Sequence, residues 1–124
     1  SDDEIEFMTG EKDIKTGVKK LIDEYHIPFI CATMGKNGSM AFFDGHIVEA
    51  APFLRDDTVE TTGAGDTFCA CLLHDVLEHG INGRKDDDVK KMLTFANAAA
   101  SLITTRKGAL RVMPEKGEVE AVIK

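Results

Sequence analysis

The chain is 124 residues long, 43% hydrophobic and 30% charged, and it carries a net charge of −7. This balance indicates a single folded domain and excludes a disordered segment. Because the charge is negative and no apolar run approaches the roughly 20 residues of a membrane span, we expect no nucleic-acid partner and no membrane partner.

The first residues predict two helices. Ser1 is a typical N-cap, and the three acidic residues after it suit the first turn of a helix. Gly10 would end this helix, and a second one begins near Asp13. Its apolar residues form one stripe, consisting of Ile14, Val18, Leu21, Ile22 and Tyr25. Because an acidic helix starts at once from a residue other than Met, we expect the chain to be cut from a longer protein.

Three strands follow. Residues 29–32 form a short continuous apolar run, which is typical of a strand covered on both faces. Residues 39–43 and 46–50 flank the pair Asp44-Gly45, a strong hairpin signal. A buried strand needs neighbours on both sides, and this chain has too few strands to supply them. We therefore expect a missing upstream segment to carry the rest of the sheet, and the open edges to invite association, including a possible homodimer.

The second half of the chain predicts helices. After a polar connection over 52–59, a helix spans 64–79 and ends at Gly80. Asp86, Asp87 and Asp88 then open another helix as N-capping and dipole-stabilising residues. The apolar face of that helix comprises Val89, Met92, Leu93, Ala96, Ala99 and Ile103. Gly108 marks its exit, and Pro114 begins a polar tail with a last helical turn over 119–123. This order of helices and strands predicts an α/β fold.

The three cysteines are Cys31, Cys69 and Cys71. An odd number argues against a disulfide framework, and two residues on one helix at this spacing point about 200° apart. We expect all three to be small buried apolar side chains in a protein of the reducing cytoplasm.

The segment from Glu60 to Phe68 is the strongest indication of function in the sequence. Its Gly63-Ala64-Gly65-Asp66 turn precedes an apolar helix, whose first turn presents unpaired N–H groups and a partial positive charge. Glycine lets the backbone approach a bound anion closely, and an acid on the same turn lies beside that anion. This combination suits phosphoryl transfer. It is neither a dinucleotide-binding fingerprint nor a Walker loop; the alternative is an ordinary glycine-rich helix start.

Two further signals point to a ligand. Residues 33–38 follow the apolar strand and contain two glycines, and ligands of open α/β sheets bind beyond the carboxyl ends of strands. The alternative there is an ordinary tight turn. Asn97 is the one polar residue in the small-residue stretch 96–100; the alternative is a capped or solvent-facing amide.

Together with Gly108-Ala109, these motifs resemble the ribokinase-like (PfkB) carbohydrate kinase family, and the residues from Ser1 to Gly10 are most similar to its fructokinase branch. The resemblance implies that residues 1–124 are the C-terminal, nucleotide-binding and catalytic portion of a three-layer α/β/α domain, with the sugar-binding half and the lid upstream. It implies ATP-dependent phosphorylation of a sugar hydroxyl, with fructose as substrate. The alternatives are ribose, 2-keto-3-deoxygluconate or a nucleoside, or a non-catalytic nucleotide-binding fragment. We expect the isolated fragment to be inactive.

The same resemblance implies roles for individual residues. Asp66 matches the catalytic base, and the anion hole around it matches Gly63, Ala64 and Gly65. The nucleotide-binding positions are Thr33, Gly35, Gly38, Gly65 and Asn97, of which Asn97 lines the adenine site.

Metal sites are implied as well. Glu4 matches a glutamate that acts on Mg²⁺ through water. A monovalent cation, K⁺, is implied at Glu60, Thr62, Ile103, Arg106, Gly108 and Val112, held largely by backbone oxygens. The chain departs from the family pattern at Ser1, where many members have Asn, and at Glu60, where many have Asp. Arg106 and Lys107 lie beside the anion hole and either neutralise phosphate or are exposed.

Overall fold

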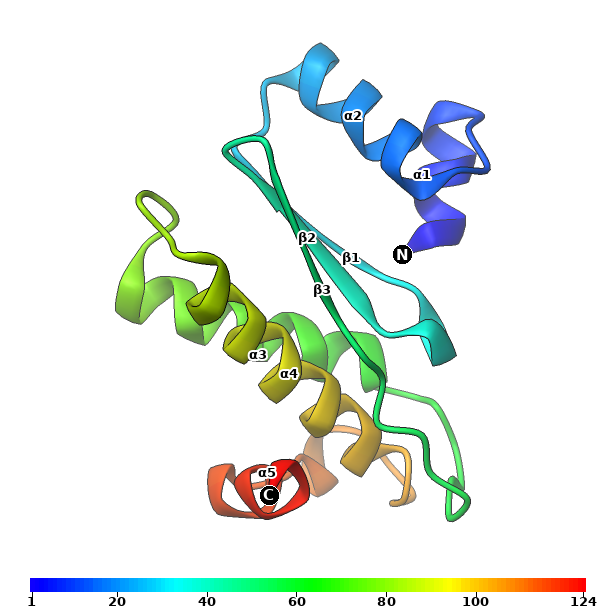
Figure 1. Cartoon of the computed structure of the whole chain (residues 1–124). Helices are drawn as coiled ribbons and strands as arrows, with labels where there is room; N and C mark the ends of the chain where they lie inside the picture. Colours follow the sequence, from blue (N-terminus) through cyan, green and yellow to red (C-terminus); the bar gives the residue numbers. More distant parts are fainter.

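The computed structural model describes all residues, 1–124, as two helical layers with a sheet between them (Figure 1). The elements in chain order are α1 (Asp2–Thr9), α2 (Ile14–Tyr25), β1 (Phe29–Thr33), the short 3₁₀ helix η1 (Gly35–Asn37), β2 (Ser39–Phe43), β3 (His46–Ala50), α3 (Ala64–His79), α4 (Asp86–Ile103), η2 (Leu110–Val112) and α5 (Lys116–Ile123). Helices α1 and α2 cover one face of the sheet, α3 and α4 the other, and α5 lies against α4 (Figure 1). The α/β prediction is therefore confirmed.

The first two helices begin and end where the sequence predicts. Ser1 and Glu4 form a capping box on α1, and Gly10 ends the helix in a left-handed conformation with φ 72°. Asp13 caps α2 by accepting a hydrogen bond from the Thr16 N–H at 2.9 Å. None of the helices has the length and apolar character needed to cross a membrane.

The sheet is antiparallel, with the order β1-β2-β3. The predicted hairpin joins β2 and β3, and its turn residues Asp44 and Gly45 both have positive φ, at 48° and 75°. All five residues of β2 are buried. The run predicted at 29–32 has helices on both faces, since Phe29 and Cys31 pack against the cluster of α3 and α4 and Ile30 and Ala32 pack against that of α1 and α2. Strand β1 is nevertheless an edge strand in this chain, and only Ala32 is fully buried.

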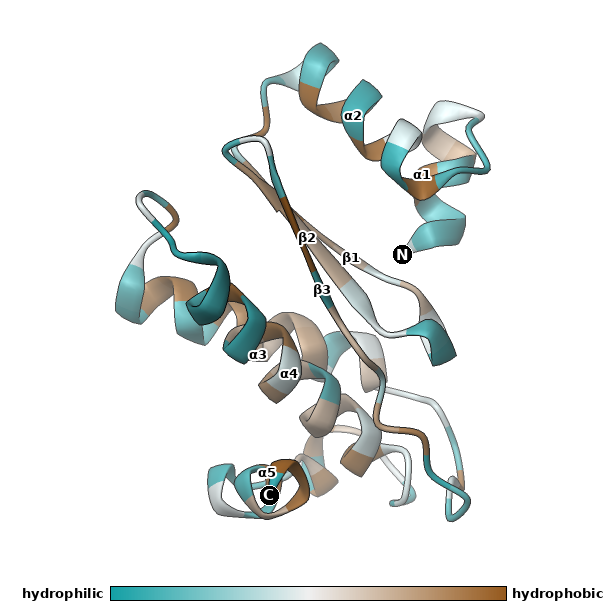
Figure 2. Cartoon of the chain, in the orientation of Figure 1, coloured by the Kyte–Doolittle hydropathy of each residue, from teal (hydrophilic) through white to brown (hydrophobic).

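Alternate residues of β2 build two separate cores. Ala41 and Phe43 face α3 and α4, where they pack with residues such as Leu93. Met40 and Phe42 face the other layer, in a cluster with Ile5, Val18 and Leu21. Figure 2 shows hydrophobic stretches in brown along the strands, and brown and teal stretches alternating along α2. A strand with apolar side chains on both faces is what a three-layer arrangement requires.

The C-terminal tail differs from the prediction. Helix α5 is longer than a last turn over 119–123, because it begins at Lys116. Val119 is only 1% exposed and packs against Ala98, Ala99 and Leu102 of α4. The charged residues and Gly117 of this segment hide its helical pattern, and a capping box formed by Glu115 and Glu118 fixes its start.

The prediction that all three cysteines are buried is wrong for one of them. Cys69 is exposed, whereas Cys31 and Cys71 are half-buried. Burial raises the pKa of the Cys31 thiol to about 12. Cys69 shares one face of α3 with Leu73 and Leu77, which are 59% and 86% exposed, and no element of this chain covers that face.

The aspartates at 86–88 occupy the first turn of α4, where a negative charge suits the helix dipole. None of them is the N-cap, however. The N-cap position is Lys85, without a side-chain hydrogen bond.

Candidate active site

The start of α3 forms an open set of backbone donors. Gly63 is the N-cap residue with φ 85°, and α3 begins at Ala64. The Ala64 N–H donates to Thr61 O at 3.2 Å, whereas the N–H groups of Gly63, Gly65 and Asp66 have no acceptor within the chain. Unpaired N–H groups at a helix start carry partial positive charge and can bind an anion. The turn therefore presents free backbone donors, and its role in binding an anion stays a prediction.

Gly63 is required at this position for two reasons. Its positive φ is costly for any residue with a side chain. A Cβ atom there would also lie 3.2 Å from Ala109 Cβ and 3.3 Å from Ile103 Cδ1. Gly65 differs, since a Cβ atom there would meet nothing within 4 Å. The bare side of Gly65 therefore faces open space beside the donors.

Asp66 lies in the first turn of α3 and is exposed. Its carboxylate makes no hydrogen bond or ion pair with the rest of the chain. It is available to a ligand bound at the neighbouring N–H groups, and its role as a base stays a prediction.

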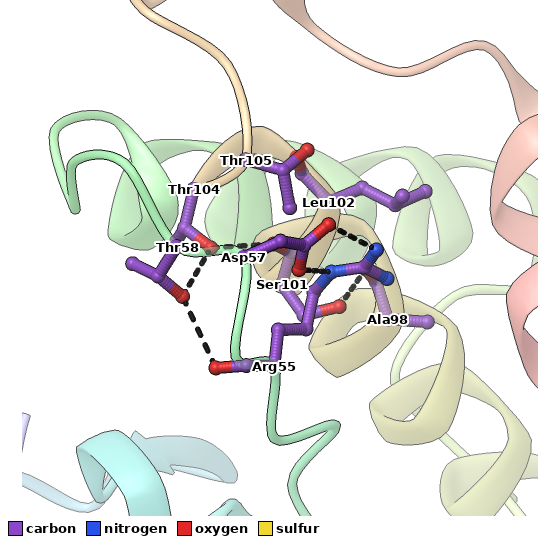
Figure 3. Close-up of polar contacts among 8 residues, drawn as sticks. All are labelled: Arg55, Asp57, Thr58, Ala98, Ser101, Leu102, Thr104 and Thr105. Carbon is purple, nitrogen blue, oxygen red and sulfur yellow. Dashed lines mark hydrogen bonds and ion pairs between the residues drawn. The ribbon is translucent and has the colours of Figure 1, made fainter.

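The segment before α3 is tied to the end of α4. The N–H groups of Val59 and Glu60 both donate to Thr104 O, at 2.7 and 3.1 Å. The Thr58 and Thr104 hydroxyls lie 3.5 Å apart, and Thr58 also donates to Arg55 O at 3.5 Å (Figure 3). These contacts set where the 60–63 turn lies relative to the sheet.

A cluster of polar contacts surrounds that junction (Figure 3). Arg55 binds Asp57 through two hydrogen bonds of 2.8 and 2.9 Å, which lowers the pKa of the Asp57 carboxyl. At the end of α4 the hydroxyl groups of Ser101, Thr104 and Thr105 donate to backbone oxygens three residues earlier. Ser101 O has no backbone donor, so the Thr104 hydroxyl satisfies a carbonyl that the helix end leaves unpaired.

The predicted nucleotide loop is a tight turn. The Met34 N–H donates to Gly38 O at 2.9 Å, and the Asn37 N–H donates to Met34 O at 2.9 Å. Gly38 has φ 91°, and a Cβ atom there would lie 2.2 Å from Ala50 O. Gly35 has φ 52° and open space around it. Thr33, at the end of β1, is half-buried. The turn itself is thus confirmed, and its role in binding a nucleotide stays a prediction.

Asn97 lies next to that loop. It is 9% exposed, and its Nδ2 donates to Ala50 O at 3.3 Å and to Ala51 O at 3.0 Å. The solvent-facing alternative for Asn97 is therefore wrong. Gly38 and Asn97 both contact Ala50, so the structure brings together two signals that are far apart in the sequence.

Glu4 stands apart from these residues. Its carboxylate accepts hydrogen bonds from the Ser1 amino group at 2.7 Å and the Ser1 hydroxyl at 2.8 Å, which lower the pKa of Glu4. No hydrogen bond or ion pair links it to another predicted site residue.

Contacts among five of the six predicted cation residues join the segment before α3 to the end of α4, and Thr62 directly precedes Gly63, the N-cap of α3. The Gly108 N–H donates to Glu60 Oε1 at 3.3 Å, and the Arg106 N–H donates to Ile103 O at 3.2 Å. Thr62 is exposed and makes none of these contacts. The Arg106 side chain was predicted either to neutralise phosphate or to be exposed; instead it donates to Val112 O at 3.0 Å and pairs with Glu118 at 2.5 Å. Lys107 is exposed.

Several partners of these residues could not be predicted from the sequence. The oxygen atoms of Ala50, Ala51 and Thr104 position the site, yet they are backbone atoms that any residue would supply. Glu118 was missed because its contact with Arg106 depends on the packing of α5.

A large hollow of the chain lies elsewhere. Its volume is about 750 Å³, and it runs along α3, α4 and the start of α5, lined by residues such as Thr67, His74, Phe95 and Val119. None of the predicted site residues lines it. At the start of α3, Thr61, Thr62, Gly65 and Asp66 are exposed.

Comparison with known proteins shows which family the chain belongs to. The sequence model described as "pfkB family carbohydrate kinase" matches residues 1–116. "Probable fructokinase-2" of Arabidopsis thaliana is 31% identical over 124 residues, which cover 100% of this chain and 37% of that protein. The "Fructokinase" of Klebsiella pneumoniae is 33% identical over 125 residues, which cover 97% of this chain and 38% of that protein.

Solved structures agree with the fold. Fructokinase from Vibrio cholerae O395, in a form bound to fructose, ADP and calcium ion, has a TM-score of 0.83 at 25% identity, covering 99% of this chain and 39% of that one. Arabidopsis thaliana ribokinase complexed with ribose and ATP has a TM-score of 0.79 at 28% identity, again covering 99% and 39%. The chain thus spans less than two fifths of the length of each of these four proteins.

Proposed function

Since the chain belongs to the pfkB family of carbohydrate kinases, we propose that it is the nucleotide-binding and catalytic portion of an ATP-dependent sugar kinase. The observation that carries this proposal is the start of α3, where three N–H groups without acceptors lie on the same turn as an exposed carboxylate. Fructose is the proposed acceptor, because the fructokinases of two organisms match nearly the whole chain.

The backbone donors would stabilise the transferring phosphoryl group. Negative charge develops on its oxygen atoms, and the N–H groups of Gly63, Gly65 and Asp66 lie at the positive end of the α3 dipole. These donors are held in place before any ligand arrives, because hydrogen bonds to Thr104 O tie the preceding segment to α4. Gly65 leaves room for a phosphate to reach them.

Asp66 would orient the sugar hydroxyl and accept its proton at a carboxylate oxygen. In a loose phosphoryl transfer, orientation of the attacking oxygen matters more than base strength. An exposed carboxylate with no other partner in the chain can turn toward that hydroxyl.

The residues present fit a nucleotide. When bound, ATP supplies the phosphoryl group, and Mg²⁺ neutralises charge on its phosphates. Thr33, Gly35 and Gly38 would hold the phosphates and ribose, with Asn97 beside the adenine. Glu4 would act on Mg²⁺ through water. In this structure its exposed carboxylate accepts a hydrogen bond from the Ser1 hydroxyl.

The rest of the domain would complete the site. Strand β1 has an unpaired edge, and the exposed Leu73 and Leu77 line an uncovered face of α3. We propose that the portion of the domain outside this chain, with the sugar-binding half and the lid, packs there; a second copy pairing along β1 is the alternative. Alone, the chain would bind nucleotide without phosphorylating sugar. A reducing cytoplasm is the proposed location.

Asp66→Asn tests this function in the complete polypeptide that carries the sequence. We expect kcat to fall by about 10²–10⁴-fold, because the proton acceptor is lost, with little change in nucleotide affinity. Asp87→Asn is the matched control, since the same chemical change is made in the exposed first turn of α4. Near-normal turnover of Asp66→Asn would refute the role.

A further inference from the structure

The hollow along α3, α4 and the start of α5 has an apolar end. Cys71, Phe95, Ala99 and Val119 line the hollow there and belong to one hydrophobic cluster. Thr67 lies one turn before Cys71 on the same face of α3, and it lines the hollow as well. Cavities of about 300–1,000 Å³ hold small molecules, and this one, at about 750 Å³, lies within that range.

The hydroxyl of Thr67 has no hydrogen-bond partner, although the residue is only 3% exposed. A threonine hydroxyl inside a helix can bond the carbonyl four residues earlier, as those of Thr9 and Thr94 do at 2.6 and 2.7 Å. In Thr67 only the backbone N–H uses this acceptor, Gly63 O, at 2.9 Å. A buried hydroxyl without a partner is unfavourable until another group supplies the missing bond. Thr67 therefore offers one donor and one acceptor to a ligand in the hollow.

The charged side chains around the hollow give no preference for an ion. Three are basic and three are acidic: Arg84, Lys91, Lys116, Asp75, Glu78 and Asp88. Two histidines of α3 also line the hollow, and each lies beside a carboxylate of its own helix. Arg84, whose side chain is 6% exposed, is already paired with Asp75 at 2.6 Å, and the Lys116 side chain is 80% exposed. An ionised group brought to the apolar end would lose its hydration, so the occupant that fits is uncharged.

We propose that the apolar end of this hollow is a second binding site, for an uncharged and largely apolar molecule that carries one hydroxyl or carbonyl group. The carbon skeleton of this molecule would pack against Phe95, Ala99 and Val119, and its polar group would exchange a hydrogen bond with Thr67 Oγ1. None of the predicted active-site residues lines the hollow. The inference therefore does not depend on the proposed kinase activity.

Phenol and toluene are the probes, because they share a ring and differ in a hydroxyl against a methyl group. The complete polypeptide that carries the sequence is titrated with each probe, and methionine methyl ¹H–¹³C resonances give the dissociation constants. Met92 and Met113 line the hollow, whereas Met34 and Met40 belong to the core of α1 and α2. We expect both probes to shift the Met92 and Met113 signals in a saturable way and to leave the Met34 and Met40 signals unchanged.

Thr67→Val replaces the hydroxyl by a methyl group of similar size. The ratio of the toluene dissociation constant to that of phenol should fall by about fivefold in this variant, because the hydrogen bond to phenol is lost. Thr94→Val is the matched control, since the Thr94 hydroxyl already has a partner and the residue lies outside the hollow. The ratio should stay unchanged in this control.

Unchanged Met92 and Met113 signals, up to the solubility limit of both probes, would overturn the proposal. So would equal shifts of Met34 and Met40, which would show non-specific binding, or a ratio that Thr67→Val leaves as in the wild type. If Thr67→Val does not fold, Thr67→Ala takes its place with the same expected fall in the ratio.

Discussion

Alanine at Gly63 and alanine at Gly65 should change the stability of the chain in opposite directions. At Gly63, φ is +85° and a Cβ atom would lie 3.2 Å from Ala109 and 3.3 Å from Ile103. The left-handed conformation and the crowding together should cost about 2–4 kcal/mol of unfolding free energy. At Gly65, φ is not positive and no atom lies within 4 Å. Alanine should therefore stabilise the helix there by about 0.5–1 kcal/mol.

Urea denaturation of the two variants measures this difference, and each variant serves as the control for the other. Titration with ADP measures a second property, the nucleotide affinity of each variant. The Gly65→Ala methyl group would stand where a phosphate approaches, so we expect its ADP affinity to fall by about tenfold or more despite its higher stability. Two destabilised variants would refute the assigned geometry, and a Gly65→Ala variant with wild-type affinity would refute the anion site.

Two other contacts give testable expectations. His46 Nδ1 lies 2.7 Å from Asp86 Oδ1, and this hydrogen bond raises the pKa of His46. The resulting stabilisation should be complete below the unfolded-state pKa of His46 and lost as the pH rises through the higher folded-state pKa. The Tm difference between wild type and His46→Gln should accordingly shrink from acidic to alkaline pH; a constant difference would contradict the pairing. Arg84, whose side chain is 6% exposed, binds Asp75 at 2.6 Å and Gly80 O at 3.0 Å. Arg84→Ala should cost about 3 kcal/mol in urea denaturation, because it removes the buried guanidinium that binds Asp75 Oδ2 and leaves this carboxylate only the His79 ring, 3.5 Å from Oδ1; a loss below about 1 kcal/mol would show that the pair is not structural.

Local signals predicted most of the fold. Gly10, Asp13 and Gly80 mark helix ends through backbone conformation and capping, and these depend on a few neighbouring residues. The Asp44-Gly45 turn needs positive φ in the same local way. Such positions can be read from a single sequence because the physics that sets them is short-ranged.

Burial was harder to predict because it depends on distant partners. Helix α5 is covered through Val119 by α4, which its charged sequence does not reveal. Cys69 looked like a core residue, but the face of α3 that carries it has no partner in this chain. In the candidate site, the α3 start was recognised from its motif. The partners of Asn97 and Arg106 were not, since they are backbone oxygens and a glutamate brought close only by folding.

The central claim is that the N–H groups at the start of α3 bind the phosphates of a nucleotide. Amide ¹H–¹⁵N resonances of the chain, recorded during titration with ADP, test it most directly. We predict that the signals of Gly63, Gly65 and Asp66 shift most and follow one saturating curve. If ADP binds while these three signals stay unchanged and others move, the claim is wrong.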